Sequence, residues 1–188
     1  MAAVPVRIPV TEREIDDRRR LGIDKLDELW AGEWHLVNPP KMWHAQMNQD
    51  LLFVLAPRAR AVGLRSLIEP LGLFAADNDW RVPDQTHFRP EDAREEGVVS
   101  AEFVIEVRSP GDDSYKKMEF YASRGVAEFM IIHEDRRFEL YWLNDEGYLV
   151  PAKPEDDGVV RSRVLDVGFA TVAGPRLRVT WDGGSAEV

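Results

Sequence analysis

The chain has 188 residues, of which 44% are hydrophobic and 10% aromatic, a composition typical of a folded globular domain. It contains no cysteine, which excludes disulfide scaffolds, thiolate zinc sites and cysteine nucleophiles. The formal net charge of −10 opposes tight, non-specific binding to a phosphate backbone, because Lys and Arg drive such binding. No apolar run approaches the roughly 20 residues of a membrane span, and the N-terminal residues lack a signal-peptide pattern. We therefore expect a cytoplasmic protein that does not associate with membranes.

The first half of the chain predicts two helices. Thr11 and Glu14 have the spacing of a capping box, so a helix is expected to begin there. A glycine should interrupt this helix, and residues 23–30 could add another helical turn or two. From residue 42 to residue 56 the apolar side chains recur at helical spacing. Pro57 should end this second helix.

Strands in the first half are expected where short runs of large apolar residues lie between turn residues, at 32–38, 67–68, 73–74 and 81–88. An exposed acidic loop should follow at 89–97.

The second half predicts a buried sheet. Residues 98–107 are mostly apolar, as expected of a central strand. A helix should cover residues 114–124, with Gly125 as its C-terminal cap. Residues 128–133 and 137–143 predict a buried strand and its hairpin partner, followed by short strands and turns. We expect one domain over residues 1–188, with frayed ends at 1–10 and 182–188.

Two carboxylates could carry chemistry. Asp84 follows Val82-Pro83 early on an expected strand, although Pro-Asp by itself is common in turns. Glu106 sits within an otherwise apolar stretch, Phe103-Val104-Ile105 followed by Val107, where an ionised carboxylate is costly unless it is paired or holds a metal. For Glu106 alone, a strand-end carboxylate or an ion pair with Arg108 is an equally good interpretation.

A cation that could assist these carboxylates has two candidates. Arg108 should lie on the same face of the strand as Glu106, but a guanidinium cannot serve as a general base. Lys117 belongs to the following helix and could reach back to the carboxylates, although an exposed helix charge is the commoner state. His35 and His44 could approach the same cleft, and a structural role is the favoured interpretation for each.

The order of these motifs resembles the Uma-two (Uma2) family, a large group of bacterial proteins placed among the PD-(D/E)XK nucleases. The resemblance covers roughly residues 25–145. It is carried by Glu-Val-Arg-Ser-Pro at 106–110, Lys-Met-Glu-Phe-Tyr-Ala at 117–122, Gly-Val-Ala-Glu-Phe at 125–129, Val-Pro-Asp at 82–84, and the opening Gly32-Glu33, Pro39-Pro40 and His44.

The resemblance implies an α/β fold with a restriction-endonuclease-like core, in which helices flank a mixed central sheet and extra strands follow at the C-terminus. It also implies that Asp84, Glu106 and Glu33 are metal ligands. Lys117 would be the catalytic lysine, displaced onto the helix. Relatives tend to have an apolar residue where this chain has Arg108, which we expect to compete for Glu106 as an ion-pair partner.

The function implied is that of a phosphodiesterase dependent on Mg²⁺ or Mn²⁺, acting as a DNA endonuclease. The chain has no P-loop, no nucleophile elbow and no dinucleotide fingerprint. It therefore lacks the backbone motifs that NTPases, serine hydrolases and dinucleotide-binding enzymes need. The acidic charge and Arg108 favour an alternative: a nuclease fold that lost its chemistry and serves in binding or assembly. A third reading is a metal-dependent hydrolase of a smaller substrate. Apolar C-terminal strands offer edges through which a homodimer could form.

Overall fold

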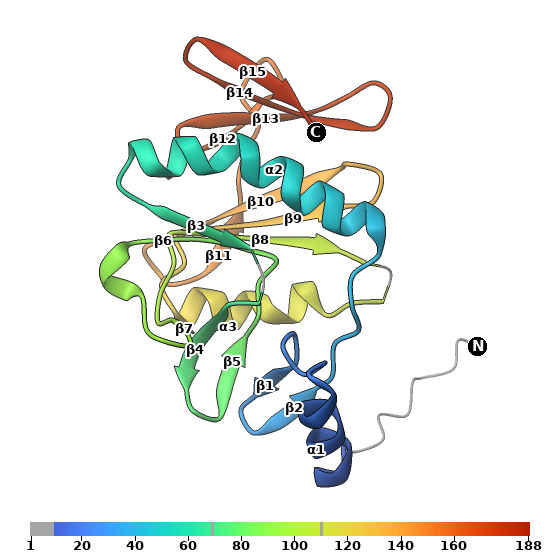
Figure 1. Ribbon diagram of the computed structural model, residues 1–188. Helices are drawn as coiled ribbons and strands as arrows, with labels where there is room; N and C mark the ends of the chain where they lie inside the picture. Colours follow the sequence, from blue (N-terminus) through green and yellow to red (C-terminus); the bar gives the residue numbers. More distant parts are fainter. Residues whose placement is uncertain (1–9, 69, 110) are drawn as a thin grey trace, which may run out of the picture.

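The computed structural model describes residues 10–68, 70–109 and 111–188. A mixed six-stranded sheet runs through the middle of the molecule in the order β11-β10-β9-β8-β6-β3 (Figure 1). β8 and β9 are parallel, and the other neighbours are antiparallel. The strands of this central sheet are β3 (Arg65–Ile68), β6 (Gln85–Phe88), β8 (Phe103–Arg108), β9 (Glu128–His133), β10 (Phe138–Leu143) and β11 (Leu149–Pro151).

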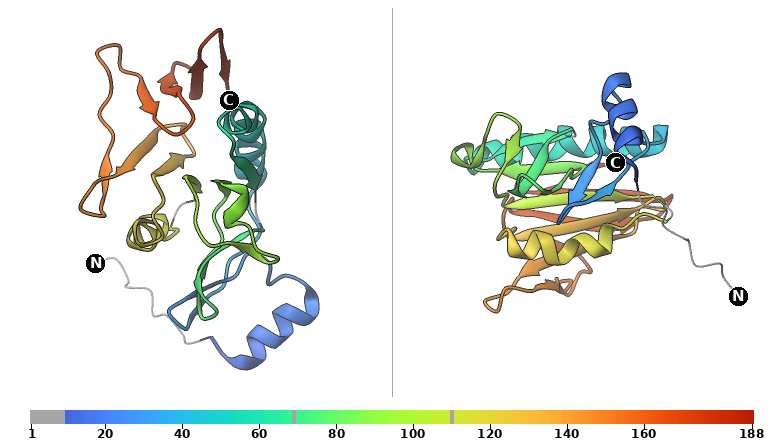
Figure 2. Two further views of the ribbon diagram at one scale, coloured as in Figure 1. Left: turned by 90° about the vertical axis from the view of Figure 1, so that its left-hand side faces the viewer. Right: turned by 90° about the horizontal axis from the view of Figure 1, so that it is seen from below.

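Helices lie on both faces of the central sheet, as Figures 1 and 2 show. α2 (Met42–Ala61) covers one face, and α3 (Met118–Ser123), preceded by the 3-10 turn η2 (Ser114–Lys117), covers the other. Burial on both faces explains the nearly continuous apolar run of β8. Ile105 and Val107 pack in the core beside α2, whereas Val104 packs in the core beside α3. The α/β class with a mixed, helix-flanked sheet is confirmed.

The prediction that Pro57 ends the second helix is wrong, because α2 continues through it to Ala61. A proline in a helix leaves the carbonyl four residues earlier without its N–H partner. Here that carbonyl belongs to Phe53, and both Phe53 and Pro57 lie on the exposed side of the helix. Water can therefore bind the freed carbonyl. No helix in the described part of the chain is both long and apolar enough to cross a membrane.

A second, five-stranded sheet lies beside one end of the central sheet, in the order β2-β1-β5-β4-β7 (Figure 1). The predicted capping box of Thr11 and Glu14 is present at the start of α1 (Glu12–Leu21), which precedes this sheet. The strands are β1 (Glu28–Trp30), β2 (Glu33–His35), β4 (Gly72–Ala76), β5 (Asp79–Arg81) and β7 (Gly97–Val98).

The expected helical turns at residues 23–30 are wrong, because this stretch ends in β1. Long-range bonds decide its conformation: Asp27 accepts two hydrogen bonds from the guanidinium of Arg18, each 2.6 Å long, and one from the Val37 N–H. These contacts hold the segment extended so that β1 pairs with β2. Tertiary contacts thus override a weak local helical preference.

Two predicted strands are each divided between the sheets. The run 81–88 belongs to β5 up to Arg81 and to β6 from Gln85, and the run 98–107 belongs to β7 up to Val98 and to β8 from Phe103. Pro83 lies at the first crossing, where its missing N–H suits a break in the ladder. Asp84 therefore stands at the junction of the two sheets.

Four C-terminal strands form a third sheet over α2, and they are β12 (Val160–Ser162), β13 (Val167–Val172), β14 (Arg176–Trp181) and β15 (Gly184–Glu187). The expected frayed tail at 182–188 is wrong, since β15 pairs with β14. Asp182-Gly183 is a strong hairpin signal, with Gly183 at a φ of 79°. Most of the other expected frayed end, residues 1–9, lies outside the described residues.

Glu128, at the start of β9, joins the central sheet to the C-terminal sheet. Its buried carboxylate accepts hydrogen bonds from the Ser162 hydroxyl at 2.6 Å and from the Arg163 and Val164 N–H groups at 2.6 and 3.3 Å. Burial raises the pKa of Glu128, which these bonds partly oppose.

We expect Glu128→Ala to lower the free energy of unfolding by about 3 kcal/mol, because it leaves several buried donors unpaired. Urea unfolding of the variant beside Glu134→Ala, in which an exposed turn carboxylate is removed, measures the effect. Equal stabilities for the two variants would contradict the role of Glu128 in joining the central sheet to the C-terminal sheet.

Candidate functional site

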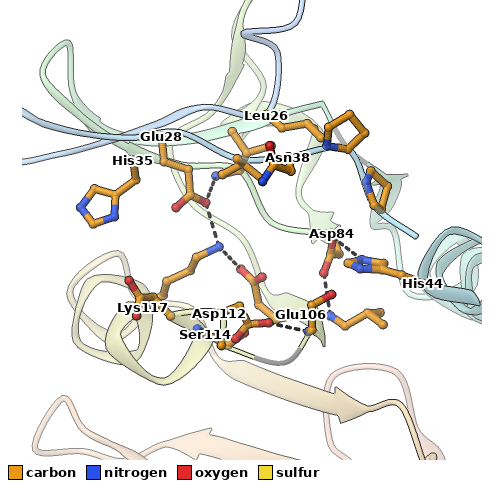
Figure 3. Close-up of a pocket in the computed structure, with 18 of the residues that line it drawn as sticks. Leu26, Glu28, His35, Asn38, His44, Asp84, Glu106, Asp112, Ser114 and Lys117 are labelled. Atoms are coloured by element: carbon orange, nitrogen blue, oxygen red, sulfur yellow. Dashed lines mark hydrogen bonds and ion pairs between the residues drawn. The ribbon is translucent and has the colours of Figure 1, made fainter. Parts of the chain in front are cut away.

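A pocket of about 460 Å³ lies where the five-stranded sheet meets the end of the central sheet. Its walls come from β1, from the segment after β2, from the start of α2, and from the loop between β8 and η2. The acidic and basic side chains at its base are Glu28, Asp84, Glu106 and Lys117 (Figure 3). Three of these were proposed from the sequence, and the fold brings those three together.

Asp84 and Glu106 meet because β6 and β8 are antiparallel neighbours. Gln85 pairs with Ile105, so one further step along the register places Asp84 opposite Glu106. β6 does not extend to Asp84, and the carboxylate of Asp84 accepts the Val107 N–H at 2.6 Å. Its other oxygen lies 2.8 Å from Nε2 of His44 on α2. The aspartate is thus fixed between the sheet and α2.

Glu106 is held from the α3 side. Its Oε1 accepts one hydrogen bond from Nζ of Lys117 at 3.0 Å and another from the hydroxyl of Tyr121. Burial raises the pKa of Glu106 to about 8, the Lys117 charge opposes that shift, and the neighbouring Asp84 and Glu28 add to it. A cluster of three carboxylates around one lysine retains a proton readily, because like charges in a dry site disfavour full ionisation.

Lys117 bridges two carboxylates from different sheets. Its Nζ lies 2.8 Å from Oε1 of Glu28 on β1 and 3.0 Å from Oε1 of Glu106 on β8. Burial by itself would lower the pKa of Lys117, but the two glutamates outweigh burial and raise it. The ammonium therefore stays protonated.

Glu28, and not the expected Glu33, lies in the pocket beside Lys117. Glu33 is exposed on β2 and does not line the pocket, whereas the side chain of Glu28 is 3% exposed. Glu28 also accepts the Val82 N–H and the indole N–H of Trp30, both at 2.8 Å. The sequence signal for Glu28 was a carboxylate beside large apolar residues, which the expectation of helical turns obscured.

Arg108 does not compete for Glu106, and that expectation is wrong. Its Nε lies 3.5 Å from Asp112, and its guanidinium lies over the ring of Tyr115. Arg108 thus contacts residues of the loop and turn that follow β8, and Glu106 forms its ion pair with Lys117. His35 and His44 both line the pocket.

The donor set suits a hard divalent cation better than zinc. No cluster of three or more His, Cys, Asp or Glu side chains in the described residues is arranged to hold a metal ion. Asp84 and Glu106 nevertheless line the same pocket, close enough that the charge of Asp84 raises the pKa of Glu106. Mg²⁺ is commonly held by one or two carboxylates together with water and substrate phosphates. These two residues therefore fit such an ion.

The mixed central sheet with a helix on each face is a restriction-endonuclease-like fold. A structure described as a "putative nuclease belonging to DUF820 from Anabaena variabilis ATCC 29413" superposes with a TM-score of 0.59 at 17% sequence identity, covering 74% of this chain and 83% of that one. The family model Uma2, described as "Putative restriction endonuclease", matches residues 24–178, and the chain belongs to this family. No curated protein matches the chain.

Proposed function

We propose that this protein is a Mg²⁺- or Mn²⁺-dependent phosphodiesterase that cleaves DNA in the pocket at Asp84 and Glu106. The observation that carries the proposal is the convergence of Asp84, Glu106 and Lys117 from three different elements. Each is nearly buried, with side-chain exposures of 10%, 7% and 11%. Burying three charged groups together is costly, and a fold tolerates such a cluster where function requires it.

Asp84 and Glu106 would hold the ion. When bound, a divalent cation of this kind polarises a phosphoryl oxygen and lowers the pKa of a coordinated water. Asp84 is prepared for this role because the Val107 N–H and His44 fix its carboxylate in place. Glu106 is fixed through Oε1 by Lys117 and Tyr121, and its other oxygen, Oε2, would be the one to hold an ion.

Lys117 would act as a fixed positive charge and not as a general base, because Glu106 and Glu28 raise its pKa. An ammonium has three N–H donors. Two of them serve Glu28 and Glu106 in the described structure, which leaves one to orient the attacking water or to bind a phosphate oxygen. Charge placed there stabilises the transition state of phosphodiester hydrolysis.

The activity is tested by nicking of supercoiled plasmid in the presence of Mg²⁺ or Mn²⁺. We expect Asp84→Asn to reduce the rate by about 100-fold or more, the scale of losing a positioned catalytic group. Asp50→Asn is the matched control, because Asp50 is an exposed carboxylate on α2. If the wild type and Asp84→Asn nick DNA at the same rate, the proposal is wrong.

Calorimetric titration with Mn²⁺ separates this proposal from a nuclease fold that serves only in binding or assembly. We expect heat of binding with the wild type and none with the double variant Asp84→Asn, Glu106→Gln. A silent titration with the wild type, together with an inactive nicking assay, would favour the non-catalytic alternative.

A further inference from the structure

A column of stacked side chains runs from the core to the pocket. The guanidinium of Arg81 lies over the ring of Phe120, 4.1 Å from its centroid, and over the ring of Trp30, 4.3 Å from its centroid. The ring of Trp30 stacks in turn on His35, with centroids 3.9 Å apart and planes 13° apart. Phe120 and Arg81 are buried, whereas Trp30 and His35 are half-buried and line the pocket.

This column is held rigidly. Arg81 donates hydrogen bonds to Asp79 and to the backbone carbonyls of Leu29 and Trp80, at 2.8 to 3.1 Å. Trp30 is fixed by its indole bond to Glu28, the carboxylate that also holds Lys117. A ring surface fixed in this way loses little conformational entropy when a planar ligand stacks on it.

The reacting groups lie deep beside the column. Figure 3 places His35 near Glu28, on the opposite side of the pocket from Asp84 and His44. Lys117 contacts Glu28, so a phosphate held at Lys117 would bring its own nucleoside toward the side of the pocket where His35 lies. A pocket of about 460 Å³ is of a size for one small ligand.

Charge also disfavours an intact duplex. The formal net charge is −10, and Asp112 and Asp113 are among the residues that line the pocket. Binding many phosphates needs many Lys or Arg contacts, whereas stacking on aromatic rings holds a single strand with few.

We propose that the pocket takes an unpaired nucleotide of single-stranded DNA, whose base stacks on His35 at the end of the Phe120–Arg81–Trp30–His35 column while its phosphate reaches Asp84, Glu106 and Lys117. This inference rests on the proposed phosphodiesterase function and specifies its substrate. The His35 ring packs on Trp30 and borders the pocket, so a base bound there would stack against this pair of rings. Stacking accepts any base, so the subsite would select for strandedness and not for sequence.

The first test compares cleavage of one end-labelled oligonucleotide as a single strand and as a blunt duplex. We expect kcat/KM to be at least about 10-fold higher for the single strand. His35→Ala should raise KM for the single strand about 10-fold, the order expected for one stacked base, with kcat nearly unchanged. His35→Phe keeps a stacking ring and should restore KM. Equal cleavage of both forms, with no effect of His35→Ala, would overturn the inference.

The second test measures stacking without cleavage. A single-stranded octanucleotide carrying 2-aminopurine is titrated into Asp84→Asn protein, and its fluorescence should be quenched on binding. His35→Ala added to this variant should abolish the quenching, and His35→Phe should retain it. If the quenching depends on His35 but the wild-type protein cleaves neither DNA form, the subsite is kept and the phosphodiesterase function is rejected. If the Asp84→Asn protein gives no quenching although the wild type cleaves DNA, only the subsite is rejected.

Discussion

Replacement of Lys117 by methionine should lower the free energy of unfolding by about 3 kcal/mol at pH 8, since it leaves the buried carboxylates of Glu28 and Glu106 without their shared cation. Methionine keeps the apolar stem of the side chain, so the loss reports charge and not packing. Glu28 and Glu106 lose contacts of 2.8 and 3.0 Å with the ammonium. The same variant should lose DNA cleavage.

Lys116→Met is the matched control for this change. Lys116 is the preceding residue in η2, is 62% exposed, and pairs only with Asp113 at 2.7 Å in the described structure. Surface pairs of this kind contribute little, so its stability should stay within about 0.5 kcal/mol of the wild type. Urea unfolding of both variants at pH 8 gives the comparison. Equal small losses would mean that the carboxylates do not depend on Lys117.

Glu106 and Lys117 could be proposed from the sequence for different reasons. Glu106 interrupts an apolar strand, and such a position demands a partner or a ligand whatever the fold. Lys117 carries no such local signal, because a lysine in a helix is usually solvated. Its assignment came from the family resemblance, and the packing of η2 and α3 across β8 then brings it to Glu106.

The position of Glu33 outside the pocket has a physical origin. The register of β1 and β2 puts Glu33 on the same face as Glu28, because Glu33 pairs with Trp30, two residues after Glu28. Glu33 lies nearer the turn, and local pattern alone does not fix which of the two glutamates borders the site. Glu28 and Glu33 lie on paired strands, β1 and β2, which are joined by a tight turn. Only the pairing of β1 with β5 places Glu28 against Val82 and hence beside Asp84.

The long elements could be predicted, whereas the division of strands between sheets could not. The apolar runs around residues 103–107 and 128–133 indicate burial on both faces, and both segments form central strands, β8 and β9. Where the chain leaves one sheet for another, at residues 82–84 and 99–102, the side chains stay buried or half-buried through the crossing, so no exposed turn marks it. Hydrophobic periodicity therefore does not reveal where the chain passes from one sheet to the other. The first of these crossings nevertheless places Asp84 at the base of the pocket.

Replacement of Glu106 by glutamine should stabilise the protein at alkaline pH while it abolishes cleavage. The pKa of Glu106 is about 8 in the folded protein and near its usual 4.5 when unfolded, so the folded state binds more protons between these values. Stability contributed by the protonated form is then full below pH 4.5 and is lost as the pH rises through 8.

The size of this effect follows from the shift in the pKa. A shift of this extent corresponds to on the order of 4 kcal/mol between acidic and alkaline pH, and coupling to Lys117 reduces the part that one substitution recovers. Glutamine cannot ionise, yet it keeps an oxygen to accept from Lys117 and Tyr121. We therefore expect Glu106→Gln to exceed the wild type by about 2–3 kcal/mol at pH 9 and to match it near pH 5.

Urea unfolding at pH 5, 7 and 9 measures this difference, and Glu119→Gln, which alters an exposed carboxylate on α3, should follow the wild type throughout. Parallel pH profiles for the wild type and Glu106→Gln would show that Glu106 is ionised at no cost in the folded protein. A gain in stability joined to a loss of cleavage would identify Glu106 as a residue kept for chemistry at the expense of stability. That pairing is expected where like charges are held together to bind a cation.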